Sequence, residues 1–232
     1  MGVDKMRALV LILIIGVMAS PTFGATRFYL PSTGTAAVSP AYAAGWLATG
    51  GTDSIRCVIK RTNTTMTDKQ TNNSNTQGNT LNRQYVSDPI AAQNITGTVK
   101  GQLRGDESAT NQDMVSAIGI RVVSNDGSTV RGTLLSITYP ALAGNEYDTS
   151  YANRYTPTST AVSSVTAQNG DRIVIEIGCY RYAAGNPPGR CTQSFGDDST
   201  TDLPEDQTTT TADNPWIEFS ADIRFPSVTL IN

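Results

Sequence analysis

The chain has 232 residues, with 17 Lys and Arg, 20 Asp and Glu and no His, and its formal net charge is −3. A mildly acidic protein lacks the basic stripe that binds phosphate backbones, so nucleic acid is not an expected partner. The absence of His excludes Ser-His-Asp and Cys-His nucleophile systems and every His-containing metal site. The length is sufficient for one large domain with a sizeable core.

The first 24 residues have the pattern of a secretory signal peptide. A basic start, MGVDKMR, precedes the apolar run ALVLILIIGVM and the small residues of ASPTFG, which predicts cleavage after Gly24. An uncleaved anchor is the open alternative, but the apolar run is shorter than the roughly 20 residues of a spanning helix. We therefore predict a mature domain of residues 25–232 that is secreted, extracellular or on a particle surface, with no stable membrane span after cleavage.

Several strands are predicted in the first half of the mature chain. TRFY opens with a short strand, and residues 55–61, IRCVIKR, form the next. Residues 62–82 are dominated by Thr, Asn, Ser and Gln, which predicts either a long exposed loop or a hydroxyl-rich edge strand. NRQYVSDP is a further strand. Residues 95–104 alternate strictly between apolar or glycine and polar positions, which is typical of a half-buried antiparallel strand.

Residues 114–138 are the segment around which the other strands can be arranged. Two β-rich runs flank the turn Asn125-Asp126-Gly127, and Gly127 can take a positive φ at no steric cost, so the segment predicts a hairpin. Ile120 lies on an apolar face of the first strand, whereas Arg121 lies on the opposite, mixed face. One apolar and one mixed face predict a sheet packed on a second sheet.

The tyrosines of GNEYDTSYANRYTP are spaced four residues apart. Tyr147, Tyr151 and Tyr155 would share one face of a short helix, or they pack as a loop lid on the rim of the domain.

Further strands are predicted at residues 160–166, 171–178 and 216–225. In DRIVIEIG the isoleucines face the core, with Arg172 and Glu176 facing outward. Seven to nine strands without βαβ alternation predict an all-β fold, a single antiparallel β-sandwich of jelly-roll type.

Three cysteines are present. Cys179 and Cys191 bracket the turn-rich segment YRYAAGNPPGR and are the natural disulfide pair in an exported protein, where the bond either stabilises the loop or staples a binding loop. Cys57 is most simply a small buried hydrophobic residue, with pairing between chains as the alternative.

An acidic stretch, GDDSTTDLPEDQTTTTADNP, is the candidate metal site. Its carboxylates offer oxygen ligands of the kind that Ca²⁺ takes, and the open alternative is a solvated loop whose Asp side chains form turns. The candidate Ca²⁺ ligands are Asp197, Asp198, Asp202, Glu205 and Asp206.

Four aromatic side chains are suited to stacking on sugar rings, although rim or core packing is the simpler reading. These candidate ligand-binding residues are Trp46, Tyr180, Tyr182 and Trp216. Glu176 and Glu218 could form a glycosidase pair if they were adjacent, and solvated strand faces are the simpler explanation for both.

The segments TRFYLPSTGTAAVSPAYAAGW, NRQYVSDP, RVVSNDGSTVRGTLL, NGDRIVIEIG and GDDSTTDLPEDQTTTTADNPWIEF together resemble uncharacterised β-sandwich proteins encoded by tailed phages and environmental metagenomes. The resemblance covers most of the mature chain and implies a virion-type protein. It carries over no site residue.

Three functions follow as hypotheses. The first is a non-enzymatic structural or adhesive β-sandwich, displayed on a virion or secreted to the cell surface, with other protein subunits or surface glycans as partners. The second is a carbohydrate-binding module, supported by Ca²⁺ as its only expected cofactor. The third is a glycosidase that works without His.

Overall fold

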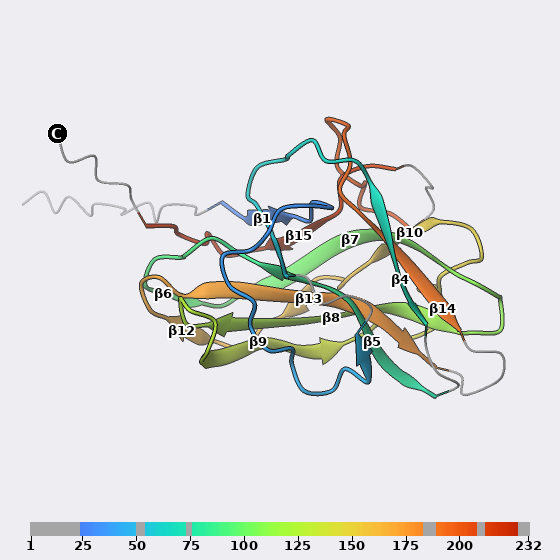
Figure 1. Cartoon of the computed structure of the whole chain (residues 1–232), viewed down its shortest axis with the longest axis horizontal. Helices are drawn as coiled ribbons and strands as arrows, with labels where there is room; N and C mark the ends of the chain where they lie inside the picture. The colour runs from blue at the N-terminus through green and yellow to red at the C-terminus, as the bar shows by residue number, and fades with distance from the viewer. Residues whose placement is uncertain (1–23, 50–53, 73–75, 183–188, 208–211, 227–232) are drawn as a thin grey trace, which may run out of the picture.

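The computed structural model describes residues 24–49, 54–72, 76–182, 189–207 and 212–226, so the predicted signal peptide lies almost entirely outside the described residues. The described chain is all-β, with fifteen strands and no helix (Figure 1). The described residues therefore contain no helix that is long and apolar enough to cross a membrane.

A seven-stranded sheet forms one layer of the fold. Its order is β1-β15-β7-β14-β4, and β10 and β11 also pair with β7. All of these pairs are antiparallel. The strands are β1 (Thr26–Tyr29), β4 (Thr67–Asn72), β7 (Thr98–Glu107), β10 (Ala152–Tyr155), β11 (Thr160–Ala161), β14 (Arg190–Phe195) and β15 (Trp216–Phe219).

A six-stranded sheet forms the other layer, in the order β2-β5-β13-β8-β9, with β3 also paired to β5. Only the short β2 and β3 run parallel to their neighbour. The strands are β2 (Ala48–Thr49), β3 (Ser54–Arg56), β5 (Gly78–Val86), β8 (Met114–Val123), β9 (Val130–Thr138) and β13 (Arg172–Arg181). A two-stranded sheet pairs β6 (Gln93–Ile95) with β12 (Val165–Ala167).

The main hydrophobic core lies between the two large sheets. Alternate residues of β13 and β8 face it, and the pairs Ile173–Val122, Ile175–Ile120 and Ile177–Ile118 stand opposite one another across the strands. Core residues from the seven-stranded sheet come from β1, β7, β14 and β15. Paired β-branched side chains at non-exposed positions stabilise adjacent strands as well as the core, because they fit the pleated surface.

The predicted hairpin is confirmed. β8 and β9 pair on either side of the turn, where Gly127 has a φ of +76° and donates its N–H to the Ser124 carbonyl at 2.8 Å. Two predicted boundaries were wrong: the strand at 55–61 ends at Arg56, and the last strand ends at Phe219. Within residues 62–82 the edge-strand alternative is confirmed by β4, and the end of this segment belongs to β5. Strands shorten where neighbours on the sheet end, because a strand needs a partner for its backbone groups.

The predicted outward positions of the six-stranded sheet are buried, which corrects the expectation for Arg121, Arg172 and Glu176. Every residue of β8 is buried, and Glu176 is 0% exposed. For Arg121 and Glu176 the cause is the segment 36–46, whose Ala36 and Val38 pack on a second, outer cluster of valines, whereas Arg172 is held by carbonyls of Asn125 and Ser87. This segment covers the outer face of the sheet, so the polar side chains there are enclosed and must be paired.

The sulfurs of Cys179 and Cys191 are bonded, and the bond joins β13 of one sheet to β14 of the other. Their Cα atoms are 6.4 Å apart, and 12 positions separate them in the sequence. Cys57 is a free, buried thiol. Its burial raises its pKa, so it is a weak nucleophile.

We expect the double substitution C179A/C191A to lower the free energy of unfolding by about 3 kcal/mol, since a loop of this size loses its closure constraint in the unfolded chain. Denaturant unfolding measures the change, with peptide mapping of the parent protein to establish the pairing. A bridge from Cys57 to either of the other cysteines would contradict the structure.

Candidate active site

The structure brings together only part of the predicted aromatic set. Tyr180 and Tyr182 form a cluster with Tyr139: the Tyr139 and Tyr180 rings stack at 3.6 Å, and Tyr182 meets Tyr180 edge-on at 4.8 Å. Trp46 lies elsewhere, where its indole N–H donates to Glu176 at 2.8 Å. Trp216 is 1% exposed and donates to the Leu203 carbonyl at 2.9 Å, so its ring is not available as a platform for a sugar.

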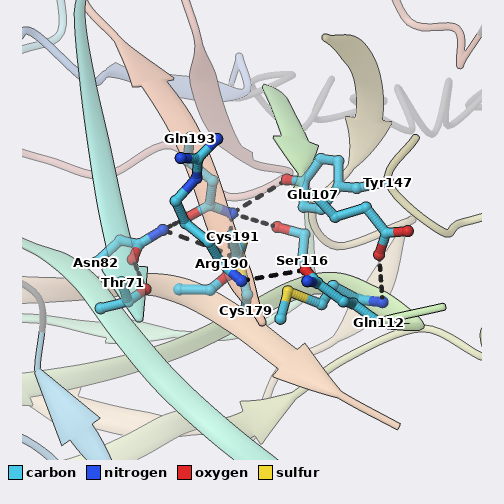
Figure 2. The surroundings of a disulfide bond; sticks show 12 residues. Thr71, Asn82, Glu107, Gln112, Ser116, Tyr147, Cys179, Arg190, Cys191 and Gln193 are labelled. Atoms are coloured by element: carbon cyan, nitrogen blue, oxygen red, sulfur yellow. Dashed lines mark hydrogen bonds between the residues drawn. A yellow bond between two sulfur atoms is a disulfide. The ribbon is translucent and has the colours of Figure 1, made fainter. Parts of the chain in front are cut away.

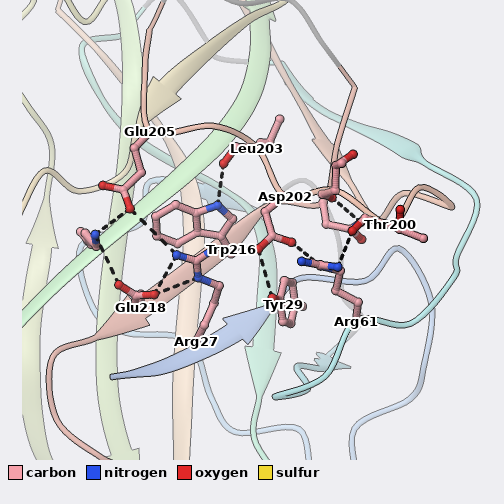
Figure 3. A network of polar contacts seen from close by, with 12 residues as sticks. Arg27, Tyr29, Arg61, Thr200, Asp202, Leu203, Glu205, Trp216 and Glu218 are labelled. Carbon is pink, nitrogen blue, oxygen red and sulfur yellow. Dashed lines mark hydrogen bonds and ion pairs between the residues drawn. The ribbon is translucent and has the colours of Figure 1, made fainter. Parts of the chain in front are cut away.

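The predicted calcium ligands do not converge on a common point. Asp202 accepts hydrogen bonds from Arg27 and Arg61, and Glu205 accepts one from Lys100 at 2.7 Å (Figure 3). Asp197 is buried and caps the turn at Ser199 N, at 3.0 Å. Asp198 is exposed and Asp206 is half-buried. Within the described ranges no group of three or more Asp, Glu, Cys or His side chains is arranged to hold a metal ion.

Because Asp202 and Glu205 are already paired with cationic side chains, we expect Ca²⁺ and Mg²⁺ at equal ionic strength to shift the melting temperature equally. Screening of the clustered carboxylates acts alike for both ions, whereas a true calcium site would disfavour Mg²⁺. A calcium-specific rise, on the order of 2.7 kcal/mol at a hundredfold excess over Kd, would show that the loop does bind Ca²⁺.

Glu176 and Glu218 do not form a carboxylate pair. Glu176 lies on β13 of the six-stranded sheet, and Glu218 lies on β15 of the seven-stranded sheet. Each is already bound by cations: Glu176 by Arg121 at 2.6 Å, and Glu218 by Arg27 at 2.8 Å. Neither is therefore a candidate acid or base.

A different group of carboxylates lines a pocket of about 410 Å³, which we call the acid pocket. It is formed where β7 ends, beside the loop 139–151 and strand β10. Figure 2 shows two of its residues, Glu107 and Tyr147, near the disulfide. The lining residues are Glu107, Thr110, Gly144, Glu146, Tyr147, Asp148, Arg154 and Gln207.

Backbone and side-chain contacts fix the loop 139–151 against the ends of the strands. The Glu107 N–H donates to the Asp148 carbonyl at 2.9 Å, and the Tyr147 N–H donates to the Met114 carbonyl at 2.8 Å. The Tyr147 ring is buried, and its hydroxyl accepts a hydrogen bond from Gln193 at 3.1 Å. Of the two alternatives for the three tyrosines, the helical face is wrong, since the described segment contains no helix. Tyr147 packs from a loop, whereas Tyr155 lies on β10.

Glu107 is the residue of the acid pocket with the most unusual environment. It is 1% exposed, and its Oε2 accepts the Met114 N–H at 3.0 Å. Within the described part of the chain, its Oε1 makes no hydrogen bond. Arg154 also lines the pocket, but it donates to backbone carbonyls, including that of Gln207 at 3.0 Å, and not to a carboxylate. Arg154 therefore does not neutralise the Glu107 carboxyl.

This environment favours the protonated form of Glu107. Burial raises its pKa to about 7, and the charges of Glu146 and Asp148 act in the same direction, against the hydrogen bond from Met114. Burial also raises the pKa of Glu146, and Arg154 opposes that rise. A buried carboxyl that keeps its proton near neutral pH is the form that general acid catalysis requires.

Sequence reasoning missed this site because its parts are far apart in the chain. Glu107 stands in GDES and the two other carboxylates in GNEYD, and neither segment has a motif that marks acid–base chemistry. The one available signal was weak: both segments follow predicted strands, and loops at strand ends often carry function.

No protein-family model matches the chain, and no curated protein matches it. Among solved structures, a CocE/NonD family hydrolase from Staphylococcus aureus is similar at 9% identity with a TM-score of 0.51, over 88% of this chain and 37% of that chain. A second structure of a CocE/NonD family hydrolase from Staphylococcus aureus matches at 10% identity with a TM-score of 0.49, over 86% of this chain and 37% of that one. An alpha-amino acid ester hydrolase matches at 8% identity with a TM-score of 0.37, over 86% and 36%.

The first of these matches contradicts the prediction of a non-enzymatic structural or adhesive protein, because that structure is described as a hydrolase and not as a virion, phage or adhesion protein. The prediction that the chain is not an enzyme is corrected with it. At 9% identity the similarity to the first hydrolase is one of fold, and the chain spans little more than a third of that protein's length.

Proposed function

We propose that this chain is an exported hydrolase of jelly-roll β-sandwich fold that uses carboxyl groups as its acid and base, with glycosidic bonds as its substrate class. The observation that carries the proposal is the placement of Glu107 in a pocket that holds two further carboxylates, with a buried side chain and one carboxyl oxygen that makes no hydrogen bond to the described residues. The similarity in fold to part of a hydrolase supports the reaction class.

The residue set limits the chemistry that the chain itself can supply. Since the chain has no His, a Ser-His-Asp system cannot form within it. Glycoside hydrolysis needs only two carboxyl groups, one to protonate the leaving oxygen and one to activate water or attack the sugar. We assign the acid to Glu107 and the second role to Asp148, which is exposed at the same pocket.

The fold and export parts of the proposal rest on separate observations. Two sheets enclose one core, and strands far apart in sequence, such as β1 and β15, are neighbours within a sheet, which supports a jelly-roll sandwich. The disulfide between Cys179 and Cys191 suits an oxidising compartment, in agreement with cleavage after Gly24.

The proposal is tested with the protein from Ala25 onward and a panel of oligosaccharides and polysaccharides, by measuring new reducing ends. Hydrolysis of one linkage class is expected, with a fall of about 10²–10⁴ in Glu107→Gln. Glu205→Gln is the matched control, because this glutamate is exposed and lies outside the acid pocket. Failure of every glycan to react, or full activity in Glu107→Gln, would overturn the proposal.

A second candidate function follows from the partial coverage of the matched hydrolase. The chain covers 37% of that protein, so it would serve as the β-domain that works beside a separate catalytic domain. Hydrolysis that appears only when a catalytic partner is added, and that is unchanged in Glu107→Gln, would favour this candidate.

A further inference from the structure

A second pocket, of about 760 Å³, has a different character from the acid pocket. It lies between the segment 32–39 and strands β3, β4 and β5, and we call it the arginine pocket. Among the described residues, its lining contains two cationic side chains, Arg83 and Lys69, and no acidic one. The remaining lining is small and polar or apolar, in a protein whose net charge is negative.

Arg83 is buried and has no carboxylate partner in the part of the chain that the structure describes. It is 5% exposed, and its guanidinium lies 4.9 Å from the centre of the Phe195 ring. Its hydrogen bonds, to the Pro31 carbonyl at 3.5 Å and the Tyr85 hydroxyl at 3.4 Å, are long, and both use the same nitrogen, Nη1. Bonds of this length are weak, so most of the five donors of the guanidinium have no strong acceptor.

Arg172 and Arg121 show how two other buried arginines of this fold are satisfied. Arg172 is 8% exposed and donates to the Asn125 carbonyl at 2.9 Å and to the Ser87 carbonyl at 3.0 Å. Arg121 has a carboxylate partner instead. It is 7% exposed, much like Arg83, and it is paired with Glu176 at 2.6 Å. Removing a charge from water is costly unless a counter-charge and hydrogen bonds replace the solvent. Arg83 has neither a carboxylate nor hydrogen bonds of ordinary length among the described residues, so an anion in the pocket would supply acceptors that its guanidinium lacks.

Two further groups of the arginine pocket are available to such an anion. The Ser32 hydroxyl is buried and has no hydrogen-bond partner in the described structure, and the residue is 4% exposed. Lys69 lies on edge strand β4 and makes no ion pair with the described residues. A hydroxyl, an ammonium and a guanidinium around one cavity form a donor set for an oxyanion.

We propose that the arginine pocket binds the oxyanion group of a small ligand, either a carboxylate or a sulfate or phosphate ester, with Arg83 as the main anchor. Lys69 adds a second positive charge at the open side, and Ser32 donates a hydrogen bond from the wall. The volume exceeds that of a bare ion and lies within the usual range for small-molecule sites, so an acidic sugar or a ligand of similar size fits.

Calorimetric titration with sodium glucuronate, sodium sulfate and sodium phosphate, each against sodium chloride at equal ionic strength, tests the proposal and separates the sources of the oxyanion. Saturable binding of at least one oxyanion is expected. Lys69→Gln should weaken it about tenfold and Arg83→Gln should abolish it, because charge-assisted hydrogen bonds are the stronger class. Ser32→Ala should weaken binding severalfold and keeps the test decisive if Arg83→Gln fails to fold.

Lys60→Gln is the matched control, since Lys60 is exposed and lies outside the arginine pocket. Absence of saturable binding, or equal affinity in Lys69→Gln and Lys60→Gln, would overturn the proposal. The measurement records binding without turnover, so its outcome does not depend on whether the acid pocket is catalytic.

Discussion

Replacing Glu107 by Gln lowers kcat by about 10²–10⁴ on the substrate of the acid pocket, with a smaller change in KM. Glutamine keeps the shape of the side chain and can accept the Met114 N–H, but it has no proton to transfer to the leaving group. Initial rates of wild type and variant at saturating substrate measure the effect. Loss of activity through KM alone would instead indicate that Glu107 only binds substrate.

The pH profile gives an independent check on the same residue. The pKa of Glu107 is raised to about 7, so the acid form is lost as the pH rises through that value. Activity of the wild type should therefore fall on the alkaline side of about pH 7, whereas any residual activity of Glu107→Gln should lack this limb. A wild-type alkaline limb at the ordinary glutamate pKa would contradict the assignment.

The same raised pKa has a consequence for stability. Between the ordinary glutamate pKa of 4.5 and about 7, the folded state binds more protons at this position than the unfolded state. The free energy of unfolding therefore falls as the pH rises through this window. Glu107→Gln should show a flatter stability profile there and be the more stable protein at pH 8, by denaturant unfolding. Glu205→Gln, at an exposed position, should keep the wild-type slope.

The inner faces of the sheets were predictable because their chemistry is local. The alternation of Ile173, Ile175 and Ile177 has the period of a strand and places all three in the core, and Gly127 marks the hairpin turn. The outer face was not predictable in the same way. Glu176 lies on an alternating strand that appears half-solvated by pattern, and only the fold of segment 36–46 over the sheet removes it from water.

The acid pocket was beyond local reasoning for a related reason. Glu107 is brought beside Glu146 and Asp148 by backbone hydrogen bonds between the end of β7 and a later loop. The raised pKa depends chiefly on that enclosure, and the nearby charges of Glu146 and Asp148 add to it. By contrast, the disulfide pair was accessible from the sequence, since spacing and turn-rich composition between Cys179 and Cys191 already favoured it.

Glu176→Ala should lower the free energy of unfolding by about 3–5 kcal/mol, because it leaves Arg121 as an uncompensated buried charge. The Glu176 carboxylate is 0% exposed and accepts hydrogen bonds from Arg121 at 2.6 Å, Gln84 at 3.0 Å and the Ala43 N–H at 2.9 Å. It also accepts the indole N–H of Trp46 at 2.8 Å. The substitution therefore leaves four donors without their acceptor at once and detaches segment 36–46 from the sheet that it covers.

Glu218→Ala is the matched control for this prediction. Its side chain is 17% exposed and also pairs with two cations, Arg27 at 2.8 Å and Lys100 at 3.4 Å, but both cations reach solvent and have Glu205 nearby. Its loss should cost about 1 kcal/mol or less. Denaturant unfolding of both variants gives the difference, and hydrogen exchange should show loss of protection at Ala43 in Glu176→Ala alone.

Arg121→Met in the Glu176→Ala background should recover part of the stability but not all of it, since Gln84, Trp46 and the Ala43 N–H remain without an acceptor. Equal costs for the two glutamate substitutions would show that Glu176 is solvated, as its strand pattern alone suggests.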